Sequence, residues 1–267
     1  TNQRGGLRGI AMARTKFKYA DVGGCEAIKA AFRRRFAGPQ PPSVIVRIDE
    51  LEKSIGGAQG DLSGTTSDQI GVVLQAMQDE GWDGMVLVGP PGCSKSLLSY
   101  ATGNEFETPT LTWDLGACKG SLVGQSEERI RSVVRVLKAV GGRNVFLVAT
   151  CNKLDIVPPE LKRRFLSGIW YCGLPNEVER DQIWEICETK YKIPAQERPD
   201  HNRWTGSDIE ACCRQAYVQG LSLAEAALTF VPVAHTDPQG IEKLEALADG
   251  RFLSASAPGR YQRYGAA

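Results

Sequence analysis

The residues of this chain whose types and spacing best suit chemistry lie at 89–96, where the sequence reads GPPGCSKS. An apolar run precedes this segment and two leucines follow it, so we expect a strand, a loop and a helix. The backbone N–H groups of such a loop and the positive end of the helix can hold phosphate groups. Lys95 would contact the outer phosphates, and Ser96 would bind Mg²⁺ through its hydroxyl group. The alternative interpretation is an ordinary turn before a helix.

One position differs from the pattern G-x-x-x-x-G-K-[ST], because Ser94 stands where a second glycine is usual. If Ser94 adopts a positive φ, its side chain costs on the order of 1 kcal/mol. Micromolar nucleotide binding supplies about 8 kcal/mol, so this cost is tolerable. The predicted nucleotide-binding loop consists of Gly89, Pro90, Pro91, Gly92, Cys93, Ser94, Lys95, Ser96 and Leu97.

Two adjacent acidic residues, Asp49 and Glu50, end a β-branched run at 43–48 that predicts a strand. Acids at the carboxyl end of a parallel strand lie where open α/β sheets bind ligands. We expect Asp49 to hold Mg²⁺ and Glu50 to activate a water molecule. Asn152 follows the strand predicted at 144–150 and would position that water. The alternatives are a solvated acidic pair and an asparagine that caps a turn.

Length, charge and cysteine content limit the class of protein. The 267 residues can form one large or two small domains, and a net charge of +1 predicts no general affinity for nucleic acid or anionic membranes. We see no apolar run near the ~18 residues of a membrane span, and no secretory signal. The eight scattered cysteines favour reduced thiols over disulfides or zinc ligands. We therefore expect an intracellular, cytoplasmic protein without membrane insertion, from a cellular or viral source.

Strand, helix and loop patterns alternate four times in the first two thirds of the chain. This alternation predicts an α/β fold with a parallel sheet covered on both faces. Strand patterns disappear after Leu174, so we expect a small all-α domain there. We divide the chain into a flexible N-terminal arm at 1–18, a nucleotide-binding core at 19–172, and a helical domain with a C-terminal tail at 173–267. The last fifteen residues of that tail should fray.

Several segments between about residues 19 and 220 resemble motifs of AAA+ ATPases of the AAA branch. Their number makes the resemblance specific. The segments are DVGG at 21–24, similar to the motif near adenine; IDE at 48–50, similar to Walker B; 89–96, similar to Walker A; 122–127, similar to the pore loop; ATCN at 149–152, similar to sensor 1; LKRRF at 161–165, similar to the arginine-finger turn; and TGSDIE at 205–210, similar to the start of the lid helix.

The resemblance implies an ATPase with a P-loop NTPase sheet of five parallel strands and a helical lid, with ATP and Mg²⁺ as ligands. It further implies nucleotide contacts from Asp21, Val22, Gly23, Gly206 and Ser207.

The resemblance also implies a shared site between subunits. Arg164, or as second choice Arg163, would act as a finger on the neighbour's γ-phosphate, and a finger can be worth about 10³-fold in rate. A homo-oligomeric ring follows, most often a hexamer in this family. The alternative for both arginines is a salt-bridged surface turn. Leu122 and Val123 would line the pore, although translocating members usually place an aromatic residue where Leu122 stands.

The order of the motifs differs from the family order, because the strand before Asp49 precedes the Lys95 loop. The core therefore resembles a circular permutation in which the unit at 43–80 has moved. The strands of the family, numbered in the family's own chain order, lie across the sheet as 5-1-4-3-2. After the move, the connections between strands run in the same directions as in the unpermuted family, so the crossovers stay right-handed. Asp49 should then still face the phosphate loop.

The leading hypothesis is an ATP-hydrolysing ring that remodels or translocates a macromolecule, with a protein favoured over DNA as substrate. One alternative is a nucleotide-gated assembly or scaffold protein with little turnover. Another is DNA handling, suggested by the arginines of the N-terminal arm, although the near-zero net charge argues against it.

Overall fold

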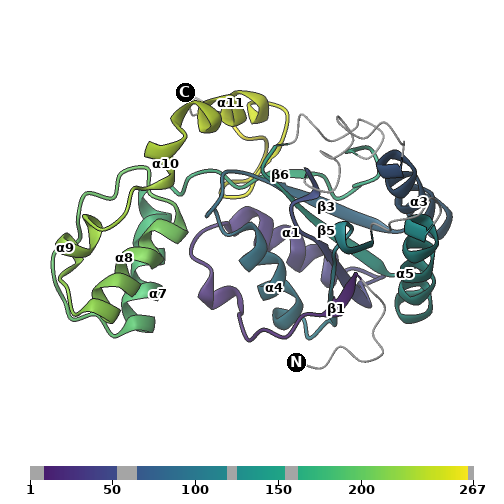
Figure 1. The fold of residues 1–267 in the computed structure, drawn as a ribbon, viewed down its shortest axis with the longest axis horizontal. Helices are drawn as coiled ribbons and strands as arrows, with labels where there is room; N and C mark the ends of the chain where they lie inside the picture. The colour runs from purple at the N-terminus through teal and green to yellow at the C-terminus, as the bar shows by residue number, and fades with distance from the viewer. Residues whose placement is uncertain (1–8, 53–64, 119–124, 154–161, 264–267) are drawn as a thin grey trace.

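A seven-stranded sheet with the order β1-β4-β2-β5-β3-β6-β7 forms the centre of the molecule (Figure 1). The computed structural model describes residues 9–52, 65–118, 125–153 and 162–263. All neighbouring strands pair in parallel except β1, which is antiparallel to β4. The strands are β1 (Ile10–Met12), β2 (Val44–Ile48), β3 (Asp83–Val88), β4 (Thr110–Trp113), β5 (Val145–Cys151), β6 (Ile169–Tyr171) and β7 (Leu253–Ser254).

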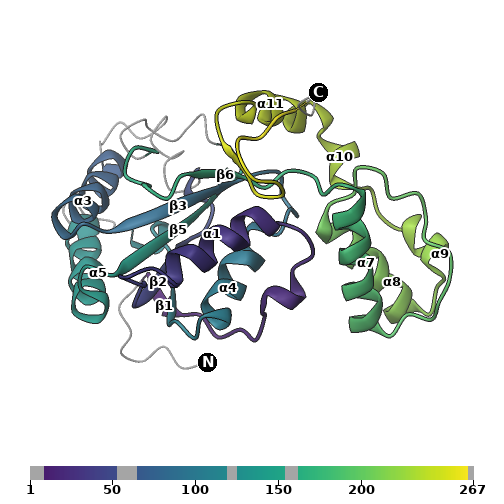
Figure 2. The same cartoon turned by 180° about the vertical axis from the view of Figure 1, so that it is seen from behind.

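Helices cover both faces of this sheet. The helical segments of this part are η1 (Tyr19–Asp21), α1 (Glu26–Phe36), α3 (Thr65–Glu80), α4 (Lys95–Glu105), η3 (Gly116–Cys118) and α5 (Gln125–Gly141). Helices α1 and α4 lie on one face, where Ile45 packs among their buried apolar residues, and α3 and α5 lie on the other, against Val44 and Val46 (Figures 1 and 2). Successive side chains of a strand point to opposite faces, so β2 contributes to both cores. The expected α/β architecture is confirmed.

A helical region lies beyond the sheet, on the left of Figure 1. Its helices are α7 (Glu177–Tyr191), α8 (Gly206–Gln219) and α9 (Leu223–Ala227). Helices α10 (Val233–Thr236) and α11 (Pro238–Ala248) then lead back to the sheet, where Leu244 and Ala248 of α11 belong to the same apolar core as Val44 and Val46 (Figure 1). Helices α7 and α8 begin at capping boxes formed by Asn176 and Thr205, whose side chains accept hydrogen bonds from the first helical turn. Trp184, Ile209 and Cys213 share a separate apolar core that holds α7, α8 and α9 together.

The prediction of five strands was wrong, because short strands are added at both edges of the sheet. Residues 10–12, in the expected flexible arm, form β1, and Asn104 of α4 donates hydrogen bonds to the carbonyl groups of Thr15 (3.1 Å) and Phe17 (2.8 Å). The expected fraying of the C-terminal residues is wrong for β7, which pairs with β6, and for Tyr261, whose ring lies 4.3 Å from that of Tyr171. Tertiary contacts order both segments although their sequences show no strand pattern.

The carboxyl ends of the parallel strands β2, β3 and β5 meet at one edge of the sheet. Strand β2 lies between β4 and β5, and β3 lies between β5 and β6, so β5 separates the two strands that precede the predicted acidic pair and phosphate loop. This arrangement brings segments distant in the chain to a single site. Within the described residues, we find no helix with the length and apolarity needed to span a membrane.

Candidate active site

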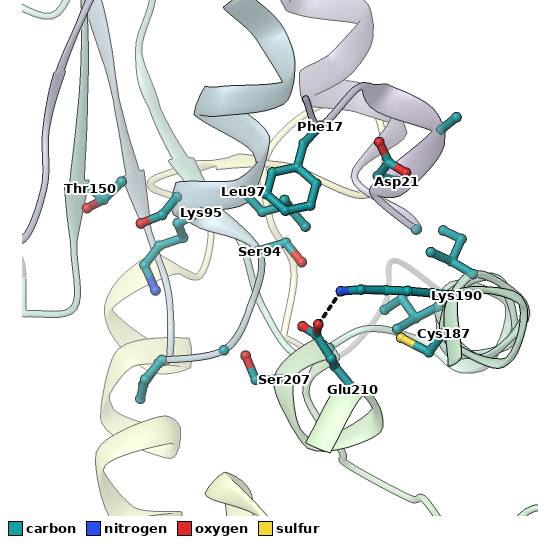
Figure 3. A pocket seen from close by; sticks show the side chains of 18 of the residues that line it. Phe17, Asp21, Ser94, Lys95, Leu97, Thr150, Cys187, Lys190, Ser207 and Glu210 are labelled. Carbon is teal, nitrogen blue, oxygen red and sulfur yellow. Dashed lines mark hydrogen bonds and ion pairs between the residues drawn. The ribbon is translucent and has the colours of Figure 1, made fainter. Parts of the chain in front are cut away.

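A pocket of about 1080 Å³ lies between the carboxyl edge of the sheet and helices α7 and α8 (Figure 3). This volume suits a ligand of nucleotide size. The lining comes from the predicted phosphate loop, the ends of β2 and β5, the segment at 17–23, and the facing sides of α7 and α8. Most of the residues predicted from the sequence therefore surround one cavity.

The phosphate loop joins β3 to α4 and holds two residues with positive φ. Gly92 has φ +83°, and an added Cβ there would lie 2.6 Å from Oγ1 of Thr205. Ser94 has φ +55° and ψ +9°, so the positive φ that its place in the motif suggested is confirmed. A left-handed conformation costs a non-glycine residue on the order of 1 kcal/mol, which the loop tolerates.

Lys95 places a buried positive charge at the floor of the pocket. Its ammonium group donates hydrogen bonds to the carbonyl oxygens of Gly89 (2.7 Å) and Pro90 (2.6 Å), and the residue is only 7% exposed. Burial lowers the pKa of Lys95 because it removes the charged form from water. The negative charge of an anion that enters the pocket would therefore offset the unfavourable desolvation of the Lys95 ammonium group.

Asp49 and Ser96 meet at the pocket although they are far apart in the chain. The Ser96 hydroxyl donates to Oδ1 of Asp49 at 3.3 Å, and the Thr150 hydroxyl donates to the same oxygen at 3.3 Å. The acidic strand and the phosphate loop thus converge as the sequence predicted. Thr150 lies in the segment similar to sensor 1, but only Asn152 of that segment was predicted as a site residue.

Arg47 pairs with Asp49 and was also missed. Its guanidinium group donates to both carboxylate oxygens, at 2.7 and 2.8 Å, and to the Ser99 hydroxyl at 2.5 Å. It lies 3.3 Å from the ring centroid of Tyr100, and no part of Arg47 is exposed. A charged residue inside the β-branched run at 43–48 was the available signal. The pairing holds the Asp49 carboxylate in one orientation beside the phosphate loop.

Glu50 and Asn152 line the pocket next to Asp49. Glu50 has φ +50°, and its backbone N–H donates to Oγ1 of Thr150 at 3.0 Å. Non-glycine residues with positive φ are costly and cluster at functional sites. The amide nitrogen of Asn152 donates to Oε1 of Glu52 at 2.9 Å, a partner that the sequence analysis did not identify.

The segment at 21–23 and the start of α8 form the far side of the pocket. Asp21, Gly23, Gly206 and Ser207 line it, and the Ser207 backbone N–H donates to the Gly92 carbonyl oxygen at 3.2 Å. Four residues predicted to contact the nucleotide do not line this pocket, and all four are buried. They are Val22, Gly89, Pro90 and Cys93.

Several lining residues were not predicted from the sequence, among them Phe17, which precedes η1, and residues of α7. Lys190 of α7 forms an ion pair with Glu210 of α8 at 2.5 Å (Figure 3). Burial opposes ionisation of Glu210, but hydrogen bonds from Lys190 and Tyr191 lower its pKa. Long-range pairing between two helices leaves no local pattern in a sequence.

The predicted finger arginines lie outside this pocket. Arg164 donates to Oε1 of Gln78 on α3 at 2.6 Å, and Arg163 is exposed. Neither residue lines the pocket of its own chain. The predicted pore residues Leu122 and Val123 lie outside the described residues.

The oxygen atoms at Asp49 and Ser96 fit a magnesium ion. Mg²⁺ prefers oxygen ligands and is commonly held by one or two protein groups together with substrate phosphates. The 3.3 Å separation of the Asp49 carboxylate and the Ser96 hydroxyl fits such a site. In the described part of the chain, no cluster of three His, Cys, Asp or Glu side chains could form a metal cage.

The described cysteines are free thiols at positions 25, 93, 151, 172, 187, 212 and 213.

Comparison with known proteins agrees with this geometry. Residues 85–142 match the family model for the ATPase family associated with various cellular activities (AAA). The chain is 29% identical over 234 residues to the uncharacterized AAA domain-containing protein ycf46 of Pyropia yezoensis, covering 65% of this chain and 47% of that protein. It is 26% identical over 198 residues to the cell division cycle protein 48 homolog of Archaeoglobus fulgidus, covering 56% of this chain and 27% of that protein.

A solved structure shares the fold. The crystal structure of the FIGL-1 AAA domain superposes with a TM-score of 0.52 at 15% sequence identity, covering 90% of this chain and 91% of that one. The chain spans about half the length of the ycf46 relative. The chain is thus similar in sequence to AAA domain-containing proteins over about half to two thirds of its length, and similar in fold to a solved AAA domain.

Proposed function

We propose that this protein binds Mg²⁺–ATP in the pocket, hydrolyses it, and couples hydrolysis to remodelling or translocating a macromolecule. The observation that carries the proposal is the 3.3 Å contact between Asp49 and Ser96 beside the buried ammonium group of Lys95. Asp49 follows β2, whereas Lys95 and Ser96 begin α4, and together they supply the metal ligands and the cation that phosphoryl transfer needs.

Each residue has a role in the hydrolysis. Lys95 and the N-terminus of α4 bind the phosphate groups, and Asp49 and Ser96 hold Mg²⁺, which would neutralise charge on the phosphates when bound. Glu50 orients and deprotonates a water molecule, and Asn152 positions it. The water oxygen forms a bond to the γ-phosphorus while the bond to the β-phosphate oxygen breaks, which yields ADP and inorganic phosphate.

The strand order supports a circularly permuted AAA+ core. Strands β6, β3, β5, β2 and β4 are adjacent in that order, and they would take the places 5-1-4-3-2 of the family sheet. In this assignment β2 occupies the place of the Walker B strand although it precedes the Walker A strand in the chain. The contact between Asp49 and Ser96 is what a permuted but functional site requires.

The proposed mechanism also requires assembly into a ring, because one catalytic residue would come from the neighbouring subunit. Arg164, with Arg163 as second choice, would reach the γ-phosphate of a neighbouring subunit, in keeping with its position outside the pocket of its own chain. A hexamer is the expected ring, with Leu122 and Val123 at its pore and a polypeptide as the substrate. The helical region from α7 onward would act as the lid.

Phosphate release with matched variants tests the proposal. Wild type should release phosphate from Mg²⁺–ATP, Lys95→Met should lose nucleotide binding, and Glu50→Gln should lose turnover while retaining ATP-bound oligomers. Electron microscopy with a slowly hydrolysed ATP analogue should then show a ring with Arg164 at the neighbour's pocket. Normal ATP-dependent assembly without any phosphate release would favour the nucleotide-gated scaffold instead.

A further inference from the structure

Glu52 is a buried carboxylate next to the predicted catalytic residues, with no role in the mechanism above. The residue is 8% exposed and does not line the pocket. Its Oε1 accepts the hydrogen bond from the Asn152 amide at 2.9 Å, and the thiol of Cys151 also interacts with the carboxylate. Among the described residues, Oε2 has no N–H or O–H partner. Burying a carboxylate with incomplete hydrogen bonding is unfavourable for stability. This cost points to a functional reason for the acid.

The contact with Glu52 determines which end of the Asn152 amide faces the pocket. An ionised carboxylate can only accept hydrogen bonds, so the NH₂ group of Asn152 must point toward Glu52. Asn152 lines the pocket, and one N–H of its amide donates to Glu52. Because the oxygen and nitrogen lie at opposite ends of the amide, Oδ1 points away from Glu52 and is the atom that Asn152 offers to a bound ligand.

The two ends of an amide suit different partners. An amide nitrogen donates and would suit a phosphate oxygen, whereas an amide oxygen accepts and suits the O–H of a water molecule. We propose that Glu52 is a positioning residue that holds Asn152 with its oxygen toward the attacking water. This inference rests on the proposed hydrolysis and adds to it the direction of one hydrogen bond.

The first test compares Glu52→Leu with Glu52→Gln in phosphate release and in binding of a fluorescent ATP analogue. Misplacing a group that orients a reactant can reduce a rate by about 10²-fold, so Glu52→Leu should lower kcat at least tenfold. Its nucleotide Kd should stay within about threefold of wild type, because the phosphate loop is untouched. Glu52→Gln should recover most of the rate, since the glutamine oxygen can accept from Asn152.

A double-variant cycle separates positioning from a general structural effect. If Glu52 acts through Asn152, Glu52→Leu should cause no further loss of kcat in an Asn152→Leu background. A kcat for Glu52→Leu within about twofold of wild type, or an equal loss in both backgrounds, overturns the inference. A wild type that binds but does not hydrolyse ATP refutes the proposed function as well, so the two failures are distinguishable.

Reversing the hydrogen bond gives a second test that does not depend on the folding of Glu52→Leu. Asn152→Asp places two carboxylates together and should lower kcat strongly. Adding Glu52→Gln should restore much of it, because the glutamine can donate to one aspartate oxygen and leave the other as an acceptor. If Asn152 acts through its NH₂ group, no recovery will occur, since aspartate has no donor.

Discussion

Replacement of Arg47 by methionine tests whether the buried guanidinium group holds Asp49 in place. The change removes two charge-assisted hydrogen bonds to Asp49, at 2.7 and 2.8 Å, and one to Ser99 at 2.5 Å. Methionine keeps much of the apolar stem. Breaking a buried ion pair typically costs about 3–5 kcal/mol, but the Asp49 side chain is 33% exposed and water can replace part of the lost contact. We expect the free energy of unfolding to fall by about 2–3 kcal/mol.

A double-variant cycle isolates this pair. Arg47→Met, Asp49→Asn and the combined variant should show a coupling energy of about 1–3 kcal/mol, because each single change leaves the other partner without its counter-charge. Urea unfolding followed by tryptophan fluorescence measures the three values. Arg33→Met is a matched control, since Arg33 is half-exposed and lies 4.0 Å from Glu26; its effect should stay within about 0.5 kcal/mol. Additivity of Arg47→Met and Asp49→Asn within about 0.5 kcal/mol would refute the ion-pair account.

Three further predictions concern binding, packing and pH. Lys95→Met should weaken nucleotide binding by about 100-fold or more, because it removes the charged donor to the phosphates. It should not lower the unfolding temperature, because the ammonium group of Lys95 is desolvated in the folded protein; a destabilised variant in calorimetry would contradict this. Gly23→Ala should destabilise the fold by about 1–3 kcal/mol, since its Cβ would lie 2.6 Å from Ile183, whereas Gly71→Ala, with open space in α3, should not; equal unfolding midpoints would contradict it. Burial, and then the charge of Arg180, lower the pKa of His201 below its ordinary value of 6.5. As the pH falls, His201 therefore takes up a proton in the unfolded chain before it does so in the folded protein, and the free energy of unfolding should decrease below about pH 6.5. His201→Gln should flatten that part of the profile and exposed His235→Gln should not; identical profiles would contradict the assignment.

Much of the site could be predicted because its parts carry local signals. The phosphate loop combines a strand, a glycine-rich turn and a helix start in one stretch, and Asp49 and Glu50 end a recognisable strand. The parallel arrangement then brings both to one edge of the sheet, where the 3.3 Å contact between Asp49 and Ser96 forms. Such features can be predicted from short segments, because their chemistry and their backbone geometry are encoded together.

The missed features depend on contacts between distant parts of the chain. Strand β7 has two residues and gains its pairing only when the C-terminal segment returns to β6. Glu52 and Asn152 are far apart in sequence, and neither residue alone indicates that the other will be its partner. Arg47 interrupts an apolar strand, and only the fold shows that Asp49, Ser99 and Tyr100 surround it.

For the proposed hydrolysis, Asp49 and the Lys95 loop must share one metal-bound nucleotide. The most direct test is the affinity of a fluorescent ATP analogue with Mg²⁺ and with a chelator, in wild type and in Asp49→Asn. We predict that Mg²⁺ strengthens binding to wild type by about tenfold or more, equivalent to about 1.4 kcal/mol, and that Asp49→Asn loses most of this enhancement while its metal-free affinity is retained. An equal Mg²⁺ enhancement in both proteins would contradict the account.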